Sequence, residues 1–360
     1  MILEPTTLLI LIAVTAILSR LPFLRFPMDD DFAIYTYIAR FADKGFQQKK
    51  DLFVIGHPIW RMRLLDKVYG NPEQGVMRLR LFFMATHVAA SLVLFYAVWS
   101  FTQNMWAAFV CGLLYSFYGS SPDFTAGNYS FEQFYIPFIF MGLTLLPKNP
   151  ETMPYAGLFF GLAAVAKWSS GIYAAILMGA VAYRYGFSSM LVFAGFTALP
   201  LAISILADWK SGYIDTEGKQ QGRVRLATSL RLSRTKRIYF SVPREIMRVI
   251  GQTLPVWIIG VPAFFIALSG EHRIWLIPFT AITVAMIVLQ RGFSRYHYHP
   301  LIALLAFFTG LGFDYLLREG GIPLLAAFGT LAAAVMVNLV YMLPLFIQPS
   351  DVKNLAQHEK

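Results

Sequence analysis

The sequence has few charged residues and almost no cysteine. Only 14% of its 360 residues are charged and 57% are hydrophobic, whereas soluble domains carry about 25% charged residues. A water-soluble core of this size could not hide so much apolar surface. The single cysteine, Cys111, can form no disulfide within the chain, and it lies in an apolar run where we expect it to pack as a small residue. The composition therefore excludes an ordinary soluble protein and indicates a lipid bilayer as the solvent.

The sequence also lacks the short motifs of several enzyme classes. It contains no G-x-x-x-x-G-K-[ST], H-E-x-x-H or G-x-S-x-G motif and no evident repeat. This argues against a nucleotide-driven pump and against those classes of hydrolase. A basic N-terminal region is missing as well, since Glu4 is the first charge and Arg20 follows the apolar run. We therefore expect the first apolar run to be a membrane span and not a cleaved signal peptide.

Long apolar runs are what the sequence does contain, and they predict an all-α polytopic membrane protein. The runs are continuous and do not alternate, which favours helices over a membrane barrel. A span needs about 20 mostly apolar residues. We expect about 11 transmembrane helices in a single domain over residues 1–350, followed by a polar tail over 351–360. The predicted spans cover residues 6–23, 81–101, 105–118, 131–146, 155–166, 170–183, 190–207, 246–268, 274–289, 300–317 and 323–347.

Two hydrophilic segments interrupt these runs. The first large loop, residues 24–80, is acidic and then basic, and the second, residues 208–245, is strongly basic. Both follow odd-numbered spans, so simple alternation places them on the same side of the membrane. The net charge of +10 comes from cations in loops between apolar runs. We therefore expect membrane lipids or lipid phosphates as partners and no nucleic acid.

The acidic part of the first loop is the triplet Asp29, Asp30 and Asp31. Three adjacent acids beside a span repel one another and need a cation, a metal or a catalytic role. They precede an amphipathic stretch over residues 32–40, which we expect to be an interfacial helix. Capping of that helix is the alternative interpretation. Capping accounts for one of the acids better than for three.

Other candidate residues lie at turns and at the ends of spans. His57 precedes a proline, and it either shapes a ligand pocket or is an ordinary turn residue. Glu132 begins an apolar run, as a functional group or as a partner of the helix dipole. Lys167 separates two runs, where it binds a phosphate or carboxylate or extends to the interface. In the second loop, Arg223 and Arg225 bind anionic headgroups or a polyprenyl phosphate, or are simply solvated.

The segment 295–300 contains two histidines, His297 and His299. Residues two apart point in different directions on a helix, and no further His or Cys cluster is close in sequence, so we do not expect a metal site. An aromatic belt at the membrane interface is the alternative interpretation of this segment. No cofactor is predicted, and nothing in the sequence supports a divalent metal.

In their order along the chain, these motifs resemble those of the GT-C superfamily of membrane glycosyltransferases. The nearest resemblance is to the branch of protein O-mannosyltransferases and lipid A aminoarabinose transferases. One departure is that the acidic motif is Asp-Asp-Asp without a Glu, which leaves the position of the base open by one residue. The residues that carry the resemblance are Asp30-Asp31 with Tyr35 and Ala39-Arg40, His57-Pro58, Tyr69-Gly70, Arg78 or Arg80, Glu132, the segment Gly161–Lys167, and Arg295-Tyr296 with Pro300.

The resemblance implies an inverting transfer of a sugar from a polyprenyl-phosphate-linked donor to a lipid, glycan or protein acceptor. One of Asp29, Asp30 and Asp31 would be the general base, and preorganised cations would stabilise the leaving phosphate. It also implies a multi-pass protein of a bacterial or archaeal plasma membrane that serves the cell envelope. The implied substrate- and phosphate-binding residues are His57, Arg78, Arg80, Glu132, Lys167, Arg223, Arg225, Arg295, Tyr296 and His299.

The side of the membrane that the site faces is left open by the sequence. Both large loops are rich in cations, so the positive-inside rule places them in the cytoplasm, whereas the resemblance implies the external face. A transferase of the same fold with a cytoplasmic active site is therefore one alternative. A transporter or flippase of a lipid-linked or anionic substrate is another, although it would place ionisable residues near the middle of spans. A non-catalytic scaffold would have no need of the acidic triplet.

Overall fold

The computed structural model describes residues 4–25, 59–70, 72–121, 131–210, 242–290 and 295–320, with scattered residues between 325 and 340. Within these ranges the secondary structure is helical and contains no strand. The all-α prediction is thereby confirmed for the described residues. Several predicted features lie outside them, namely the acidic triplet, the stretch 32–40, the second loop between residues 211 and 241, and the polar tail.

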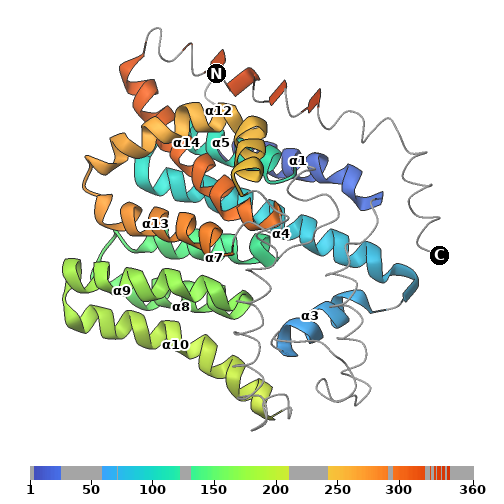
Figure 1. Ribbon diagram of the computed structural model, residues 1–360, viewed down its shortest axis with the longest axis vertical. Coiled ribbons are helices and arrows are strands. Elements are labelled where there is room, and N and C mark those ends of the chain that lie inside the picture. The colour runs from blue at the N-terminus through green and yellow to red at the C-terminus, as the bar shows by residue number, and fades with distance from the viewer. Residues whose placement is uncertain are drawn as a thin grey trace.

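The helices follow the apolar runs closely. Each of the first ten predicted spans coincides with a helix, and the described residues of the eleventh are also helical. Most of the helices whose bounds differ are longer than their apolar run, whereas α1 and α7 are shorter. The elements are α1 (Pro5–Arg20), η1 (Leu21–Arg25), α3 (Ile59–Tyr69), α4 (Pro72–Thr102), α5 (Met105–Tyr118), α7 (Phe131–Leu145), η2 (Pro150–Thr152), α8 (Met153–Ala166), η3 (Trp168–Ser170), α9 (Gly171–Tyr185), α10 (Phe187–Lys210), α12 (Val242–Leu268), α13 (Arg273–Gln290), η4 (Arg295–Tyr298) and α14 (His299–Glu319), as Figure 1 shows.

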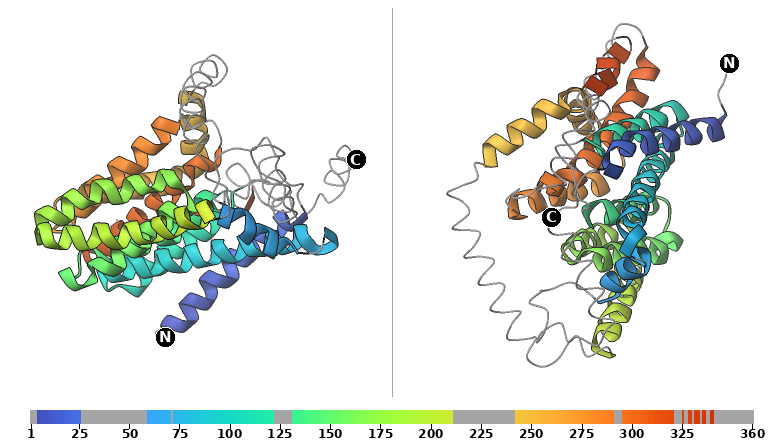
Figure 2. Two further views of the ribbon diagram at one scale, coloured as in Figure 1. Left: turned by 90° about the horizontal axis from the view of Figure 1, so that it is seen from below. Right: turned by 90° about the vertical axis from the view of Figure 1, so that its right-hand side faces the viewer.

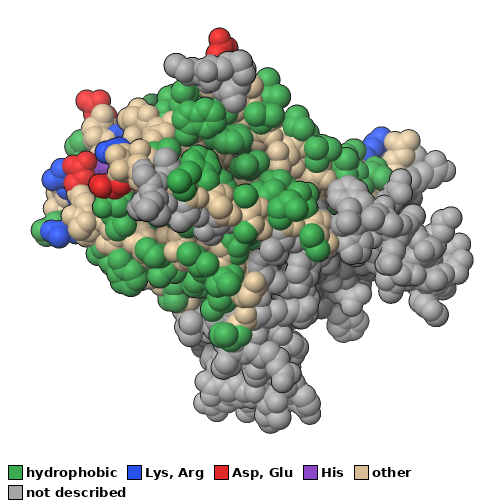
Figure 3. All heavy atoms as spheres, turned by 90° about the horizontal axis from the view of Figure 1, so that it is seen from above, with side chains coloured by type: hydrophobic (Ala, Val, Ile, Leu, Met, Phe, Trp, Pro, Cys, Tyr) green, Lys and Arg blue, Asp and Glu red, His purple; other side chains and the backbone are tan. Residues whose placement is uncertain are grey.

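Four helical segments are long and apolar enough to cross a membrane: Pro5–Leu24, Gln74–Thr102, Phe187–Ala207 and His299–Glu319. Four others, Met105–Tyr118, Phe131–Leu145, Thr253–Leu268 and Arg273–Ile287, are apolar but shorter than the roughly 20 residues that a span requires. Apolar side chains also cover much of the surface in Figure 3. These features are those of a membrane protein, and the expected number of about 11 crossings stays a prediction.

Successive helices run in opposite directions, so the bundle has two ends (Figures 1 and 2). The Glu132 end contains the start of α7 and the junctions α8–α9 and α13–α14. The Asp314 end contains the turns α4–α5, α7–α8, α9–α10 and α12–α13, together with the last turns of α14. The turns α9–α10 and α12–α13 lie at the left of Figure 1, and charged side chains gather at the same side of Figure 3.

Aromatic side chains join four helices in the middle of the bundle. The ring of Phe140 on α7 lies 5.4 Å from that of Phe279 on α13 and 5.7 Å from that of Phe307 on α14. Tyr173 on α9 lies 5.0 Å from Phe279, and its hydroxyl is 2.9 Å from Thr283 Oγ1. Aromatic pairs at these distances add to the gain from burial. The hydroxyl of Tyr173 thus has a partner in an apolar interior, where an unpaired one would be costly.

Helices α8 and α10 approach each other through two glycines. Gly157 and Gly161 are four residues apart and therefore lie on one face of α8. A Cβ atom at Gly161 would lie 2.5 Å from the carbonyl oxygen of Thr197, and one at Gly157 would meet the carbonyl oxygen of Phe193. Small residues in this spacing allow backbones to pack closely in membranes. This contact fixes the position of α8, which ends beside Lys167.

The described part of the first loop, α3, packs against the Glu132 end. Leu65 of α3 forms a small buried cluster with Leu79 and Phe83 of α4 and with Phe131 at the start of α7. The sequence predicted that the loop extends to residue 80, but α4 already begins at Pro72. The polar first turns of α4 are helical because α3 and α7 cover one of their faces.

Candidate functional site

Three ionisable side chains that are far apart in the sequence meet at the Glu132 end. The carboxylate oxygen Oε1 of Glu132 accepts a hydrogen bond from Lys167 Nζ and lies 2.7 Å from His297 Nδ1. The side chain of Glu132 is only 3% exposed, whereas those of Lys167 and His297 are 20% and 15% exposed. Glu132 is thus a buried anchor that holds two partly accessible nitrogen groups together.

Local structure explains why Glu132 and Lys167 face each other. Glu132 occupies the first turn of α7, where the helix dipole favours a carboxylate. Lys167 follows the last residue of α8 in an extended conformation (φ −148°, ψ 116°). Its carbonyl oxygen accepts hydrogen bonds from the backbone N–H and from the hydroxyl of Ser170. The chain is therefore fixed on both sides of Lys167, and the lysine side chain is directed at the start of α7.

His297 and His299 contact two neighbouring residues of α7, Glu132 and Gln133 respectively. His297 belongs to the short helix η4 and contacts Glu132, while His299 begins α14. The side-chain amide of Gln133 donates to His299 Nε2 over 3.1 Å, and both side chains are fully buried. The two histidines point in different directions, as expected for their spacing. Each reaches a different residue at the start of the same helix.

A buried polar network lies beside this site and joins α1, α4 and α5. His87 Nε2 is 3.1 Å from the carbonyl oxygen of Ser116 and 2.9 Å from the hydroxyl of Ser120. The hydroxyl of Ser19 contacts both of these serines, and Arg20 Nη2 donates to the carbonyl oxygen of Gly119 over 2.9 Å. The side chains of His87 and Arg20 are buried. The network anchors the end of α1, from which the first large loop departs.

The structure brings together only some of the predicted site residues. Glu132 and Lys167 are in contact. His299, at the start of α14, contacts Gln133, which follows Glu132 on α7. Arg80 donates a hydrogen bond to the carbonyl oxygen of Leu24 and so joins α4 to η1. Arg78 is exposed and donates to Gln74 Oε1 on its own helix over 3.1 Å.

Other predicted site residues cannot be placed in this geometry. Asp29, Asp30, Asp31, His57, Arg223 and Arg225 lie outside the described residues, and of Arg295 and Tyr296 only the backbone, in η4, is described. Among the described residues, no group of three or more His, Cys, Asp or Glu side chains could hold a metal ion. Carboxylate, ammonium and imidazole groups therefore provide the chemistry of the described part of the site.

Sequence reasoning missed His297 as a contact of Glu132, and it also missed His87, Arg20 and Gln133. A usable signal existed for His87 and for Arg20. His87 stands inside a long apolar run and Arg20 at the end of one, and ionisable residues in such places are usually functional or paired. His297 was set aside because it could not share one metal ion with His299, which the resemblance kept as a binding residue.

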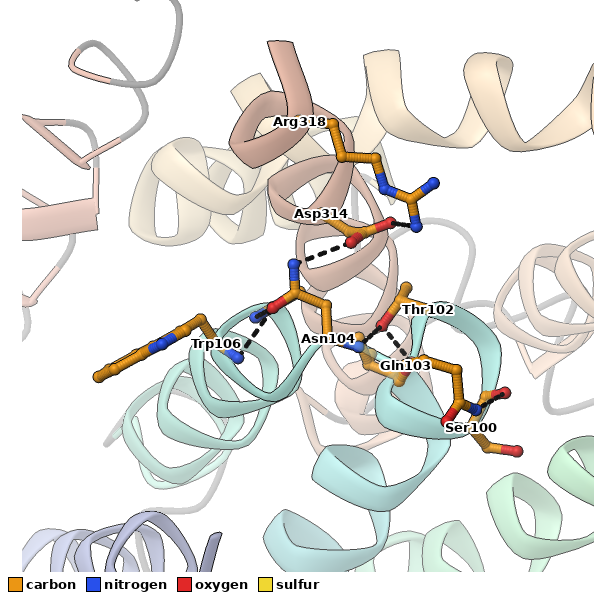
Figure 4. Close-up of polar contacts among 9 residues, drawn as sticks. Ser100, Thr102, Gln103, Asn104, Trp106, Asp314 and Arg318 are labelled. Carbon is orange, nitrogen blue, oxygen red and sulfur yellow. Dashed lines mark hydrogen bonds and ion pairs between the residues drawn. The ribbon is translucent and has the colours of Figure 1, made fainter. Parts of the chain in front are cut away.

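The Asp314 end carries a second polar cluster (Figure 4). Asn104 caps α5 by accepting hydrogen bonds from the N–H groups of Trp106 and Ala107, and its amide donates to Asp314 Oδ1 over 2.9 Å. Asp314 also pairs with Arg318 over 2.8 Å. Gln103, whose φ is +57°, follows the last residue of α4 and immediately precedes this cap. The cluster ties the α4–α5 turn to α14.

Comparisons with known proteins support the fold. No protein-family model and no curated protein matches the sequence. Among solved structures, the chain is similar to the oligosaccharyltransferase of Archaeoglobus fulgidus, solved in complex with Zn and sulfate, with a TM-score of 0.54 and 12% identity. The match covers 94% of this chain and 52% of that one, so this chain spans about half the length of the oligosaccharyltransferase. At this identity the likeness concerns the fold alone, and it does not test the branch that the sequence motifs resemble.

Proposed function

We propose that this chain is a membrane glycosyltransferase of the GT-C type that uses a polyprenyl-phosphate-linked sugar. The shared fold supports a glycosyltransferase in general terms. The observation that carries the finer proposal is the contact of Glu132 with Lys167 and His297 at the end of the bundle from which both large loops depart. In this proposal, the Glu132 end binds the lipid phosphate of the donor.

Lys167 is the residue that we assign to the phosphate. An ammonium group has three N–H donors, and one of them is engaged by Glu132. Its side chain is partly exposed while its counter-ion is buried, so a phosphate can approach the cation without displacing the carboxylate. A cation that is already oriented stabilises the charge that develops on a leaving phosphate without reorganisation. Glu132 and His297 are then positioning residues that hold this cation.

The ends of both loops support the same assignment. α1 and η1 lead into the first loop, and α10 leads into the second. Helix α3 of the first loop packs on α4 near Phe131, one residue before Glu132. In the proposed mechanism, one of Asp29, Asp30 and Asp31 takes the proton from the acceptor hydroxyl or amine. The acceptor attacks the anomeric carbon, the bond to the phosphate oxygen breaks, and the configuration inverts.

A binding experiment tests the phosphate assignment. Full-length protein in nanodiscs is titrated with radiolabelled polyprenyl-phosphate hexose and pentose. We expect Lys167→Ala to weaken binding of the accepted donor at least tenfold, since a charge-assisted contact is lost. Arg184→Ala, which removes a cation on the last turn of α9 at the Asp314 end, is the matched control and should bind normally. Equal binding by Lys167→Ala and the wild type would refute the assignment.

A transfer experiment tests the base separately. The single variants Asp29→Asn, Asp30→Asn and Asp31→Asn should each leave donor binding unchanged. At one position, release of polyprenyl phosphate in the presence of membrane acceptors should fall by about 10²–10⁴-fold. If all three variants transfer sugar at the normal rate, the acidic triplet is not the base. If the donor is moved across the bilayer and its sugar is never released, the protein is a transporter of that lipid.

A further inference from the structure

A pocket at the Asp314 end lies outside the proposed active site. It has a volume of about 440 Å³ and opens between the end of α4, the α7–α8 turn and the α12–α13 turn. This volume falls within the range of about 300–1,000 Å³ that is typical of small-molecule sites. The lining combines the aromatic residues Tyr96 and Trp99 with the polar residues Ser100, Gln103, Lys148 and His272.

Lys148 is the cation of this pocket. Its Nζ donates to the hydroxyl of Tyr96 over 3.2 Å and lies 5.6 Å from the centre of the same ring. Among the described residues, no carboxylate pairs with Lys148. The ammonium group therefore lies beside the hydroxyl edge of the Tyr96 ring, on an exposed side chain whose charge no described acid neutralises. An anionic ligand would find a positioned ammonium group there.

A second, apolar pocket adjoins the first at His272. It has a volume of about 210 Å³ and lies between the ends of α12 and α14. Ala263, Ala267, Leu311 and Gly312 form its apolar part, and the ion pair of Asp314 and Arg318 lies at its border. The ring of Phe101 lies 4.8 Å from that of His272. His272 borders both pockets, so the two lie side by side, and a ligand with a polar head and an apolar chain would reach both by passing over this side chain.

The two pockets lie at the end of the bundle where several apolar helices end. The polar pocket lies where apolar helices end, and Trp99 is 37% exposed there, as is common for aromatic residues at a membrane interface. Burial lowers the pKa of His272 below its usual value, against the opposing effect of Glu271, so the imidazole is neutral at pH 7 and offers one N–H. The Glu271 carboxylate, 3.6 Å from His272, is 86% exposed, and water and salt screen its repulsion of an anion.

We propose that these joined pockets form a site for a glycerophospholipid of the leaflet opposite the active site. Its phosphate would bind Lys148, with Gln103 and Ser100 as further hydrogen-bonding partners. The first part of one acyl chain would occupy the apolar pocket between α12 and α14. Basic pockets between membrane helices are known to select phosphate-bearing headgroups. The site does not depend on the sugar chemistry proposed for the Glu132 end.

The test uses delipidated full-length protein in neutral detergent and counts bound lipid by native mass spectrometry. Three probes are titrated: phosphatidylglycerol, diacylglycerol with the same chains, and water-soluble glycerol phosphate. We expect phosphatidylglycerol to bind saturably and more tightly than either of the others. Lys148→Ala should weaken it by about fivefold to tenfold, and Arg184→Ala, which removes a cation outside both pockets, should not.

A second variant distinguishes a lipid site from a phosphate site. Ala267→Trp fills the apolar pocket and leaves Lys148 in place, so it should weaken phosphatidylglycerol and not glycerol phosphate. If glycerol phosphate binds as tightly as the lipid and Ala267→Trp has no effect, the pocket binds free phosphate and the lipid assignment is overturned. Binding of diacylglycerol as tight as that of phosphatidylglycerol would overturn the role of Lys148. The same conclusion follows if Lys148→Ala and Arg184→Ala behave alike.

Discussion

The two ends of the bundle hold their charges in different ways. At the Glu132 end, the carboxylate is 3% exposed and has two nitrogen partners from other parts of the chain. At the Asp314 end, the carboxylate side chain is also largely buried, at 11% exposed, but its cationic partner Arg318 is 68% exposed and lies one turn away on the same helix. A charge that is taken out of water must be matched by partners, whereas a pair with one member in solvent is screened and contributes less. The first arrangement therefore stores much more interaction free energy than the second.

The largest effect in this comparison is expected from Lys167→Met. The variant leaves a buried carboxylate without its cation, and breaking a buried pair costs about 3 kcal/mol or more in the free energy of unfolding. Unfolding in mixed micelles measures the loss. The double variant Glu132→Gln/Lys167→Met removes both charges and should recover most of it. A Lys167→Met variant as stable as the wild type would show that the ion pair is solvated.

An intermediate effect is expected from Asn104→Ala at the other end. The change removes the N-cap of α5 and the hydrogen bond to Asp314, which together stabilise the fold by about 1–2 kcal/mol. Asn149→Ala is the matched control, because Asn149 caps only the three-residue helix η2. Its loss should be smaller under the same unfolding conditions. Equal losses would mean that the link from Asn104 to α14 contributes nothing.

The smallest effect is expected from Arg318→Ala. Arg318 is exposed although Asp314 is not, so we expect a loss close to the roughly 0.3–0.5 kcal/mol of helical pairs four residues apart, because Asp314 keeps its hydrogen bond from Asn104. The difference from the wild type should vanish in roughly 1 M salt, where the Debye length is about 3 Å. A loss as large as that of Lys167→Met, or one that salt does not change, would remove the contrast between the two ends.

The helices could be predicted from the sequence because backbone N–H and C=O groups in a bilayer must bond within their own segment, so that a long apolar run forms a helix. Ten helices fall on the predicted runs, and they deviate mainly at polar ends. The segment from Pro72 to Arg80 is an example: it is too polar to be recognised by hydropathy, yet it forms the first turns of α4, where α3 packs against it. The number of crossings is harder to predict. Several of the apolar helices are shorter than a membrane span, so the length of an apolar run alone does not say whether its helix crosses.

The candidate site could be predicted only as separate pieces. Glu132 and Lys167 stood out because ionisable groups at span ends are uncommon, but 35 residues separate them. Nothing in a single sequence states that the α8–α9 junction faces the start of α7. That fact follows from the packing of α8 on α7 and α10, which depends on side-chain shape at many positions.

The close contact of α8 and α10 also has a consequence for the site. A Cβ atom at Gly157 or Gly161 would meet main-chain atoms of α10, so the absence of two side chains sets the distance between the two helix axes. Lys167 directly follows α8, and its place opposite Glu132 therefore depends on that distance. Two glycines that touch no substrate thus contribute to the geometry of the site.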